Sequence, residues 1–148
     1  MFEWLGLCGD LHLSWLPNKP HPIGWMLKTT ACAIVGVVIF MELAQRKQDM
    51  QFKKWHDQFG ATTACTLRCT ETWHNSGRIT IADSWFGSVR TALALMSRGL
   101  FSILAIKGGH AGYPKQELIA LAPNRFDRAT MQKTFNLEQA GQQVQVTA

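Results

Sequence analysis

The stretch from Arg78 to Lys107, RITIADSWFGSVRTALALMSRGLFSILAIK, decides the fold class of this 148-residue chain. Residues Arg78–Asp83 alternate between apolar and polar side chains, a pattern that predicts a half-buried strand. Ser88 is a residue type that begins helices, and the sequence predicts a helix from there to Arg98. Gly99 is expected to end that helix.

The residues after this helix complete a β-α-β unit. Leu100–Lys107 is mostly apolar and predicts a second strand. A strand, a helix and a strand within about 30 residues predict two parallel strands joined by a crossover helix. The helix face expected to be buried consists of Val89, Ala92, Leu93 and Met96.

Upstream of this unit, the sequence predicts strands and a hairpin. Leu11–Trp15 alternates as a half-buried strand does, and the three prolines of Pro17–Pro22 predict a loop. Trp25–Cys32 and Gly36–Leu43 predict two strands joined by a tight turn. The apolar run Ala31–Met41 is expected to be a buried strand, because a bilayer span needs about 20 residues. We therefore expect no membrane association.

Two helices are expected between the hairpin and the β-α-β unit. Lys47–Phe59 carries Phe52, Trp55 and Phe59 on one face, and Gly60 is expected to end that helix. Thr63–Thr72 predicts a second, shorter helix. Trp73–Gly77 predicts a polar turn.

Beyond Lys107 the sequence patterns that predict helices and strands are weaker. Gly108–Pro114 predicts a Gly-rich loop that is no phosphate-binding loop, because it lacks the Gly-Lys-Ser/Thr ending. A strand is expected within Phe126–Leu137, and the Gln-rich residues Gln139–Ala148 are expected to be loose. An antiparallel hairpin followed by parallel strands predicts an α/β fold with a mixed sheet.

The composition permits a folded domain and does not settle its partner. Hydrophobic residues make up 47% of the chain, enough for a sizeable core, and the net charge is +5. This charge is compatible with nucleic acid as a partner, and equally with an ordinary solvated basic surface. No secretory signal is visible, so the four cysteines are expected to be reduced in an intracellular chain.

Asp83 is the candidate site residue that the pattern singles out. It follows the predicted strand and precedes the predicted helix, and ligand sites of α/β sheets lie at that edge. A carboxylate there can bind a hard divalent cation through oxygen. The alternative is structural, since an Asp between a strand and a helix often caps backbone N–H groups.

The run GRITIADSWFGSVRTALALMSRGLFSILAIKGGHAGYPK, residues 77–115, resembles the segment around the second catalytic aspartate of piggyBac-type transposases. The upstream run PNKPHPIGWMLKTTA, residues 17–31, resembles the loop and second strand of the same family. The likeness covers residues 1–118 and is most specific over residues 77–114. It implies an RNase H-like fold, with residues 1–107 a partial core and residues 108–148 the start of an inserted, mainly β or irregular segment.

The resemblance also implies a chemistry, which is the metal-dependent cleavage and transfer of DNA strands. Three carboxylates of the family hold two divalent cations, usually Mg²⁺ and alternatively Mn²⁺, and Asp83 matches the second of them. The first lies in an Asp-Glu pair upstream of the stretch matching Met1, and the third lies beyond an inserted segment in which this chain ends. Asp10 and Asp127 remain as substitute ligands. The resemblance thus predicts a catalytic-domain fragment that is inactive alone, and whether the chain is an enzyme stays open.

Further expectations rest on the resemblance. Arg78, Arg90 and Lys107 would contact the phosphates of DNA without reading bases, or else lie as solvated element ends. The family implies a nuclear location, and an exposed apolar strand edge would favour a homodimer. The alternative function is a domesticated DNA- or protein-binding module without catalysis.

Two other groups of residues invite a functional interpretation. Cys65 and Cys69, flanked by His56 and His74, could ligate zinc, but their spacing matches no zinc signature and predicts buried structural cysteines instead. The six tryptophans could stack on bases, but most fall on predicted core faces and are expected to pack inside. Trp85, with Phe86, is expected to anchor the helix start to the sheet.

Overall fold

The computed structural model describes residues 2–3, 12–121, 130–136 and 143–147 of the chain. These residues form two compact units, Met1–Thr72 and Trp73–Ala148, each of which is described here by itself. The two candidate substitute ligands, Asp10 and Asp127, lie outside the described residues. The expected division of the chain at residue 107 stays a prediction.

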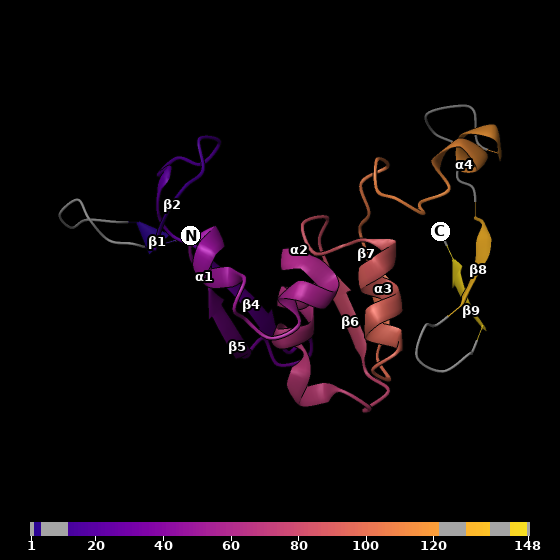
Figure 1. The fold of residues 1–148 in the computed structure, drawn as a ribbon, viewed down its shortest axis with the longest axis horizontal. Coiled ribbons are helices and arrows are strands. Elements are labelled where there is room, and N and C mark those ends of the chain that lie inside the picture. The colour runs from indigo at the N-terminus through magenta and orange to yellow at the C-terminus, as the bar shows by residue number, and fades with distance from the viewer. Residues whose placement is uncertain (1, 4–11, 122–129, 137–142, 148) are drawn as a thin grey trace. The chain divides into compact units, whose positions relative to one another are not determined.

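A small antiparallel sheet opens the N-terminal unit (Figure 1). It contains β1 (Phe2–Glu3), β2 (Leu13–Trp15) and β3 (Ile23–Trp25), in the order β1-β3-β2. The proline-rich loop expected between β2 and β3 is confirmed, and it is closed by a 2.7 Å hydrogen bond from the Leu16 N–H to the Pro22 carbonyl. Trp25 ends β3, so the prediction that it begins the next strand is wrong.

The predicted hairpin is confirmed as β4 (Leu27–Ala31) paired antiparallel with β5 (Val38–Leu43). Gly36 allows its turn because its φ of 69° is costly for other residues. The expectation that the apolar run Ala31–Met41 is a buried strand is wrong. The chain turns back within this run, so its side chains project from a two-stranded hairpin, and Ile34 is 93% exposed.

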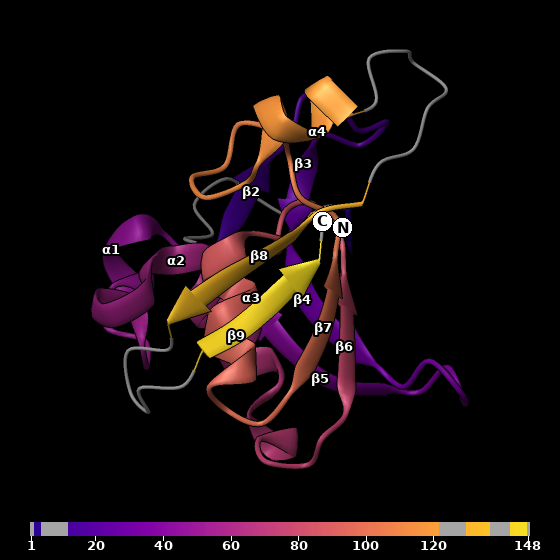
Figure 2. The same cartoon turned by 90° about the vertical axis from the view of Figure 1, so that its right-hand side faces the viewer.

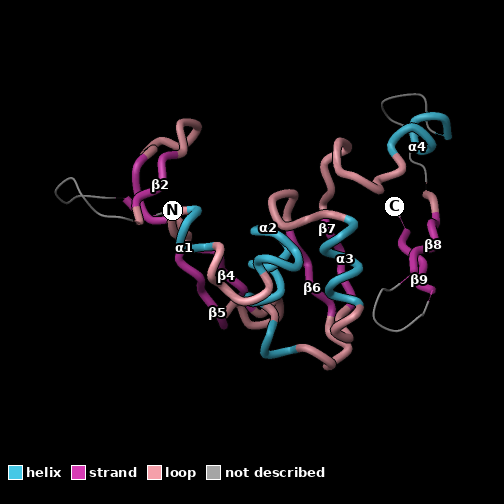
Figure 3. The backbone as a smooth tube through the Cα atoms, viewed as in Figure 1, coloured by secondary structure: helices cyan, strands magenta, loops and turns pink. Residues whose placement is uncertain are grey.

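The single helix expected over Lys47–Phe59 is wrong, because the chain leaves the helix between Met50 and His56 (Figure 3). α1 (Lys47–Met50) ends before the turn at Trp55, whose φ is 67°. α2 (His56–Cys69) has a non-helical residue at Gly60, with φ 76° and ψ 172°, so the helix is interrupted at Gly60 as expected. The second predicted helix is confirmed as the straight part of α2, and the 3-10 turn η1 (Glu71–Trp73) follows it.

The core of the N-terminal unit lies where α2 packs against β4 and β5. Cys65 and Leu67 of α2 are fully buried. A buried ion pair joins the two layers, with Arg68 Nε 2.6 Å and Nη2 2.8 Å from the carboxylate oxygens of Glu42. The Thr30 hydroxyl adds a 2.8 Å hydrogen bond from β4 to the Cys69 carbonyl.

The C-terminal unit contains the predicted β-α-β unit. β6 (Ile79–Ala82) and β7 (Phe101–Leu104) are parallel, as expected, and α3 (Val89–Met96) connects them and packs against β7. Ser88 caps α3, since its hydroxyl accepts a 3.0 Å hydrogen bond from the Thr91 N–H. The mixed α/β class inferred from the sequence is confirmed.

The buried face of α3 differs in part from the expected one. Val89 and Ala92 are buried as expected, whereas Leu93 and Met96 are only half-buried. Leu95 is fully buried instead. Periodicity alone does not determine which of two neighbouring faces of a short helix packs on the sheet.

After β7 come a loop, α4 (Lys115–Leu121) and a final hairpin (Figure 2). β8 (Gln132–Asn136) confirms the strand expected in this region, and it pairs antiparallel with β9 (Gln143–Thr147). The expectation of a loose Gln-rich end is wrong for β9, where the alternating pattern QVQVT supports a strand. In the described residues, every helix is too short or too polar to cross a membrane.

Candidate functional site

The candidate site lies at the carboxyl end of β6, where Asp83 follows Ala82. Asp83 is exposed, and its Oδ1 accepts a 2.9 Å hydrogen bond from the Trp85 N–H. Its backbone carbonyl accepts bonds from the N–H groups of Phe86 and Gly87. Asp83 therefore stabilises a tight turn, whereas Ser88 caps the helix that follows. The structural alternative, capping by Asp83, holds for the turn and not for α3.

The carboxylate of Asp83 retains the capacity to bind a cation. A carboxylate offers about four lone-pair positions, and the Trp85 N–H occupies one of them. Asp83 is thus chemically suited to a hard cation. Within the described residues, however, no group of three or more His, Cys, Asp or Glu side chains surrounds such a position.

Gly87 holds the turn against the segment that follows β7. A Cβ at this position would lie 2.0 Å from the Ala105 carbonyl oxygen, so any side chain would collide with the backbone. The contact places the Asp83 turn beside the residues that continue β7 towards Lys107. Sequence reasoning missed this role, although a glycine directly before a helix cap is a usable signal.

The three residues predicted to contact phosphates lie at different ends of the parallel β6–β7 pair. Arg90 lies in the first turn of α3, directly after the Asp83 turn, and Lys107 lies three residues after β7. Both are exposed, and both belong to the edge that carries Asp83. Arg78 precedes β6, and its carbonyl accepts from the Phe101 N–H at the start of β7. It lies at the opposite end of the strand pair, and the five residue steps of about 3.3 Å from Arg78 to Asp83 place the two about 16 Å apart.

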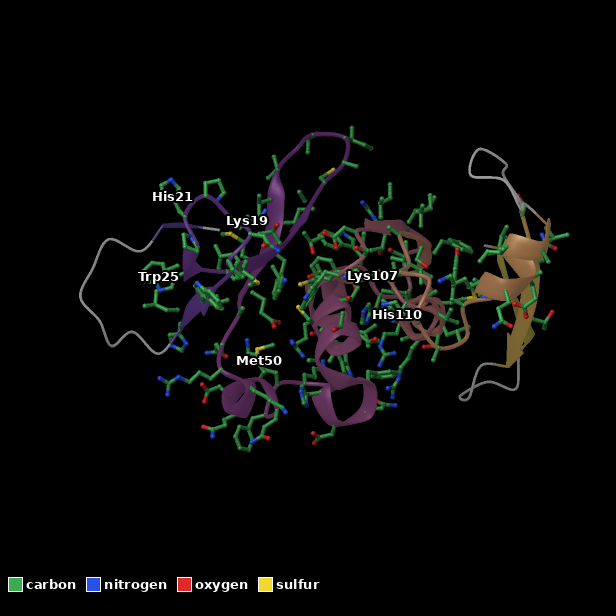
Figure 4. All side chains as sticks on the ribbon, turned by 90° about the horizontal axis from the view of Figure 1, so that it is seen from above. Lys19, His21, Trp25, Met50, Lys107 and His110 are labelled. Carbon is green, nitrogen blue, oxygen red and sulfur yellow. The ribbon has the colours of Figure 1, made fainter. Side chains whose placement is uncertain are left out.

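His110 also lies in the loop after the carboxyl end of β7, and the sequence did not predict it as a site residue. Its N–H donates a 3.0 Å hydrogen bond to the Lys107 carbonyl, and Figure 4 shows both residues on the same loop. A lone histidine in a Gly-rich loop carries no periodic signal, so only the turn in the backbone identifies it.

The two helical cysteines are buried, as predicted, with their Sγ atoms 4.0 Å apart. The hydrogen bond to Cys69 and burial hold the pKa of Cys65 well above its usual value, so this thiol is neutral at physiological pH. His56 lies near Asp57, with Nδ1 3.6 Å from Oδ1.

The expectation that the tryptophans pack inside is wrong for three of them. Trp15 is 69% exposed and Trp25 is 41% exposed, and both lie on the small N-terminal sheet. Trp85 is also exposed, and its ring packs edge-on against Phe86 with centroids 4.7 Å apart. One face of a two- or three-stranded sheet can remain exposed to solvent. The hydrophobicity of the local sequence does not reveal which face this is.

Comparison with known proteins identifies relatives of this fold. A family model described as Transposase IS4 matches residues 12–146. A solved piggyBac transposase synaptic complex with hairpin DNA is similar in structure, with a TM-score of 0.63 and 13% sequence identity. The match covers 93% of this chain and 29% of that transposase, so the chain spans less than a third of its length. No curated protein sequence matches the chain.

These matches confirm the resemblance to piggyBac-type transposases inferred from the residues, at the level of family and fold. Transposases of this class generally use divalent metal ions. The roles of Asp83, Arg78, Arg90 and Lys107 stay predictions.

Proposed function

Because the chain belongs to the Transposase IS4 family and has the fold of a piggyBac transposase, we propose that it is part of a metal-dependent DNA transposase catalytic domain. Asp83 is the proposed ligand of Mg²⁺ or Mn²⁺. The observation that carries the proposal is its exposed carboxylate at the carboxyl end of β6, beside the crossover helix. Two divalent cations, when bound in such a site, stabilise both the attacking and the leaving oxygen of a phosphodiester exchange.

The chain's own residues have two proposed tasks. Asp83 holds a cation while its Oδ1 keeps the bond to the Trp85 N–H. Arg90 and Lys107 neutralise DNA phosphates at the same edge, without reading bases. The further carboxylates that a two-metal site needs come from outside the described residues, and Asp10 and Asp127 are candidates. DNA is the proposed partner, the nucleus the proposed location and a homodimer the proposed assembly.

The second candidate function is a DNA- or protein-binding module without catalysis. It is favoured by one observation, that the described residues contain no group of three or more His, Cys, Asp or Glu side chains that could hold a metal ion. Binding through Arg90 and Lys107 would then persist without any role for a metal.

The variant Asp83→Asn tests the metal site cleanly. The Asn side-chain oxygen can still accept from the Trp85 N–H, so the turn remains while the charge is lost. In the presence of millimolar Mn²⁺, we expect paramagnetic broadening of the amide signals around Asp83 in the wild-type chain and none in Asp83→Asn. The matched control is Asp57→Asn, which removes an exposed carboxylate in the N-terminal unit.

Plasmid nicking separates the two candidate functions. Nicking that requires Mg²⁺ or Mn²⁺ and disappears in Asp83→Asn would establish a working site. Binding to DNA without nicking, unchanged in Asp83→Asn, would establish the binding module. Broadening that survives in Asp83→Asn would refute the assignment of Asp83 as a ligand.

A further inference from the structure

The β2–β3 hairpin carries an aromatic face that the candidate site does not use. Leu13 lies opposite Trp25, and Trp15 lies opposite Ile23, in the antiparallel register. Directly opposed residues share a face, and residues two apart along a strand share it as well. These four side chains therefore lie on one side of the sheet, with Ser14 and Gly24 on the other.

This face points away from the protein, as the exposures show. Trp15 is 69%, Ile23 49% and Trp25 41% exposed, whereas Gly24 on the opposite face is buried. Two indole rings at such a position leave apolar area in contact with water. Scattered single exposed apolar residues are ordinary, but a contiguous aromatic patch marks a binding surface.

The β2–β3 hairpin and the β4–β5 hairpin up to Met41 carry basic and no acidic residues, whereas the neighbouring strand β1 contributes Glu3, which pairs with Gly24 and not with a tryptophan. Between His12 and Met41 the sequence holds Lys19, Lys28 and two histidines and no Asp or Glu. Lys19 and His21 lie in the loop that joins β2 to β3, at the end of the hairpin where Trp15 pairs with Ile23 (Figure 4). An aromatic face on a hairpin whose loop carries a lysine and a histidine, with no carboxylate in this stretch, complements a polyanion that carries flat rings.

We propose that this face binds unpaired nucleotides of single-stranded DNA, with bases stacked on Trp15 and Trp25 and phosphates near Lys19 and His21. Diagonal neighbours across an antiparallel pair are about 7–8 Å apart. That spacing is about twice the 3.4 Å rise per nucleotide within one DNA strand. The two rings can thus receive bases of one short segment. Indole rings stack on every base, so the binding would be insensitive to sequence.

This inference rests on DNA as the proposed partner but not on Asp83 or on a metal. It concerns the N-terminal unit, whereas the candidate metal ligand lies in the C-terminal unit. Binding is therefore to be measured in EDTA, where the cation site cannot contribute. Failure here would leave the Asp83 test untouched, and failure at Asp83 would leave this test untouched.

The test uses the full 148-residue chain and a fluorescein-labelled oligo(dT) of twelve nucleotides, followed by fluorescence anisotropy. Replacing Trp15 or Trp25 by Val keeps a β-branched residue in the strand but removes the stacking surface. Each variant is expected to bind roughly tenfold more weakly. Trp15→Phe should restore part of the affinity. Binding to a duplex of equal length should not depend on either tryptophan.

Phe52→Ala is the matched control. Phe52 is an aromatic residue of the same unit, 84% exposed, in the turn after α1 and off this sheet. Its removal should leave oligo(dT) binding unchanged. An equal loss of oligo(dT) affinity in Phe52→Ala would mean that any exposed aromatic side chain binds the oligonucleotide nonspecifically. That result would overturn the proposal.

A measurement on the unmutated chain covers the case in which a variant fails to fold. Photocrosslinking to a bromodeoxyuridine-substituted oligonucleotide, read by mass spectrometry, should map to Trp15 or Trp25. Crosslinks that map only elsewhere would overturn the proposal. So would a dimer that dissociates in Trp15→Val while oligo(dT) binding stays the same, because the occupant of the face would then be a second copy of the chain.

Discussion

Asp83 and Gly87 bracket the turn that carries the candidate site, and each residue is required for a different chemical reason. Asp83 supplies an oxygen that the Trp85 N–H needs as an acceptor. Gly87 has no side chain, and the turn can therefore approach the Ala105 carbonyl closely. The first requirement is met by Asn as well as by Asp, and the second is met by no other residue than glycine.

At this scale we expect Gly87→Ala to destabilise the C-terminal unit by about 1–3 kcal/mol, because the added Cβ would force the backbone at Ala105 to move. Urea unfolding followed by circular dichroism measures the change. Gly109→Ala is the control, since a Cβ there meets no atom within 4 Å. Equal stability of the two variants would contradict the close contact.

At the scale of elements, the Glu42–Arg68 pair joins β5 to α2. Burial by itself would raise the pKa of Glu42, but the hydrogen bonds and charge of Arg68, with Lys53 nearby, hold that pKa below its usual value. The Lys53 ammonium lies 3.5 Å from the Glu42 carboxylate. Arg68 also donates a 2.8 Å bond to the Lys54 carbonyl, which ties the chain before α2 to the helix.

A lowered carboxyl pKa has a definite consequence for stability. The unfolded chain binds the proton more tightly, so the contribution is present above the unfolded pKa of 4.5 and is lost as the pH falls through the folded value. We expect the free energy of unfolding to decrease below about pH 4.5 in the wild type. Glu42→Gln should lower stability at pH 7 by about 3 kcal/mol, because it leaves Arg68 buried without its partner.

Denaturant titrations between pH 3 and pH 7 check this prediction. The difference between the wild type and Glu42→Gln should shrink as the pH falls. Asp49→Asn, at an exposed position of α1, should follow the wild type throughout. A constant difference across the whole range would mean that the Glu42 charge is not what stabilises the pair.

The region between β5 and α2 shows why some element boundaries differ from those that the sequence predicts. Phe52, Trp55 and Phe59 have helical spacing, yet the chain adopts left-handed backbone at Trp55. Lys53 and Lys54 then approach Glu42 and Glu71 instead of continuing a helix face. Both ion pairs join residues more than ten positions apart, and a local window of sequence does not contain such contacts.

At the scale of the whole molecule, the β6–β7 pair leaves one face open. α3 contacts β7, whereas Ile79, Ile81, Phe101 and Ile103 are each more than half exposed. They oppose one another in register, as Ile79 with Phe101 and Ile81 with Ile103. Parallel sheets are ordinarily covered on both faces. We therefore expect self-association through this face at high protein concentration.

Ile81→Lys should reduce that self-association and change stability by less than about 0.5 kcal/mol, since the side chain is already exposed. Sedimentation velocity over a range of concentrations measures the effect. The control is Ile119→Lys, which places the same charge at an exposed apolar position of α4. If both variants sediment like the wild type, the open face is not what drives association.

The sequence by itself determined the β-α-β unit, the β4–β5 hairpin and the position of Asp83. Those features depend on alternation, on a cap at Ser88 and on the placement of glycines, all of which are local. The motif around Asp83 was specific enough to indicate the transposase family.

Only the tertiary structure decided which apolar side chains are buried and which basic residues share an edge with Asp83. Whether Trp15, Ile34 or Ile81 is covered depends on what packs over each face, and strand alternation does not name the covered side. Arg78 and Arg90 lie on either side of Asp83 in the sequence, yet β6 puts Arg78 at the far edge. Burial and proximity are set by contacts between distant segments, and those contacts exist only in the folded chain.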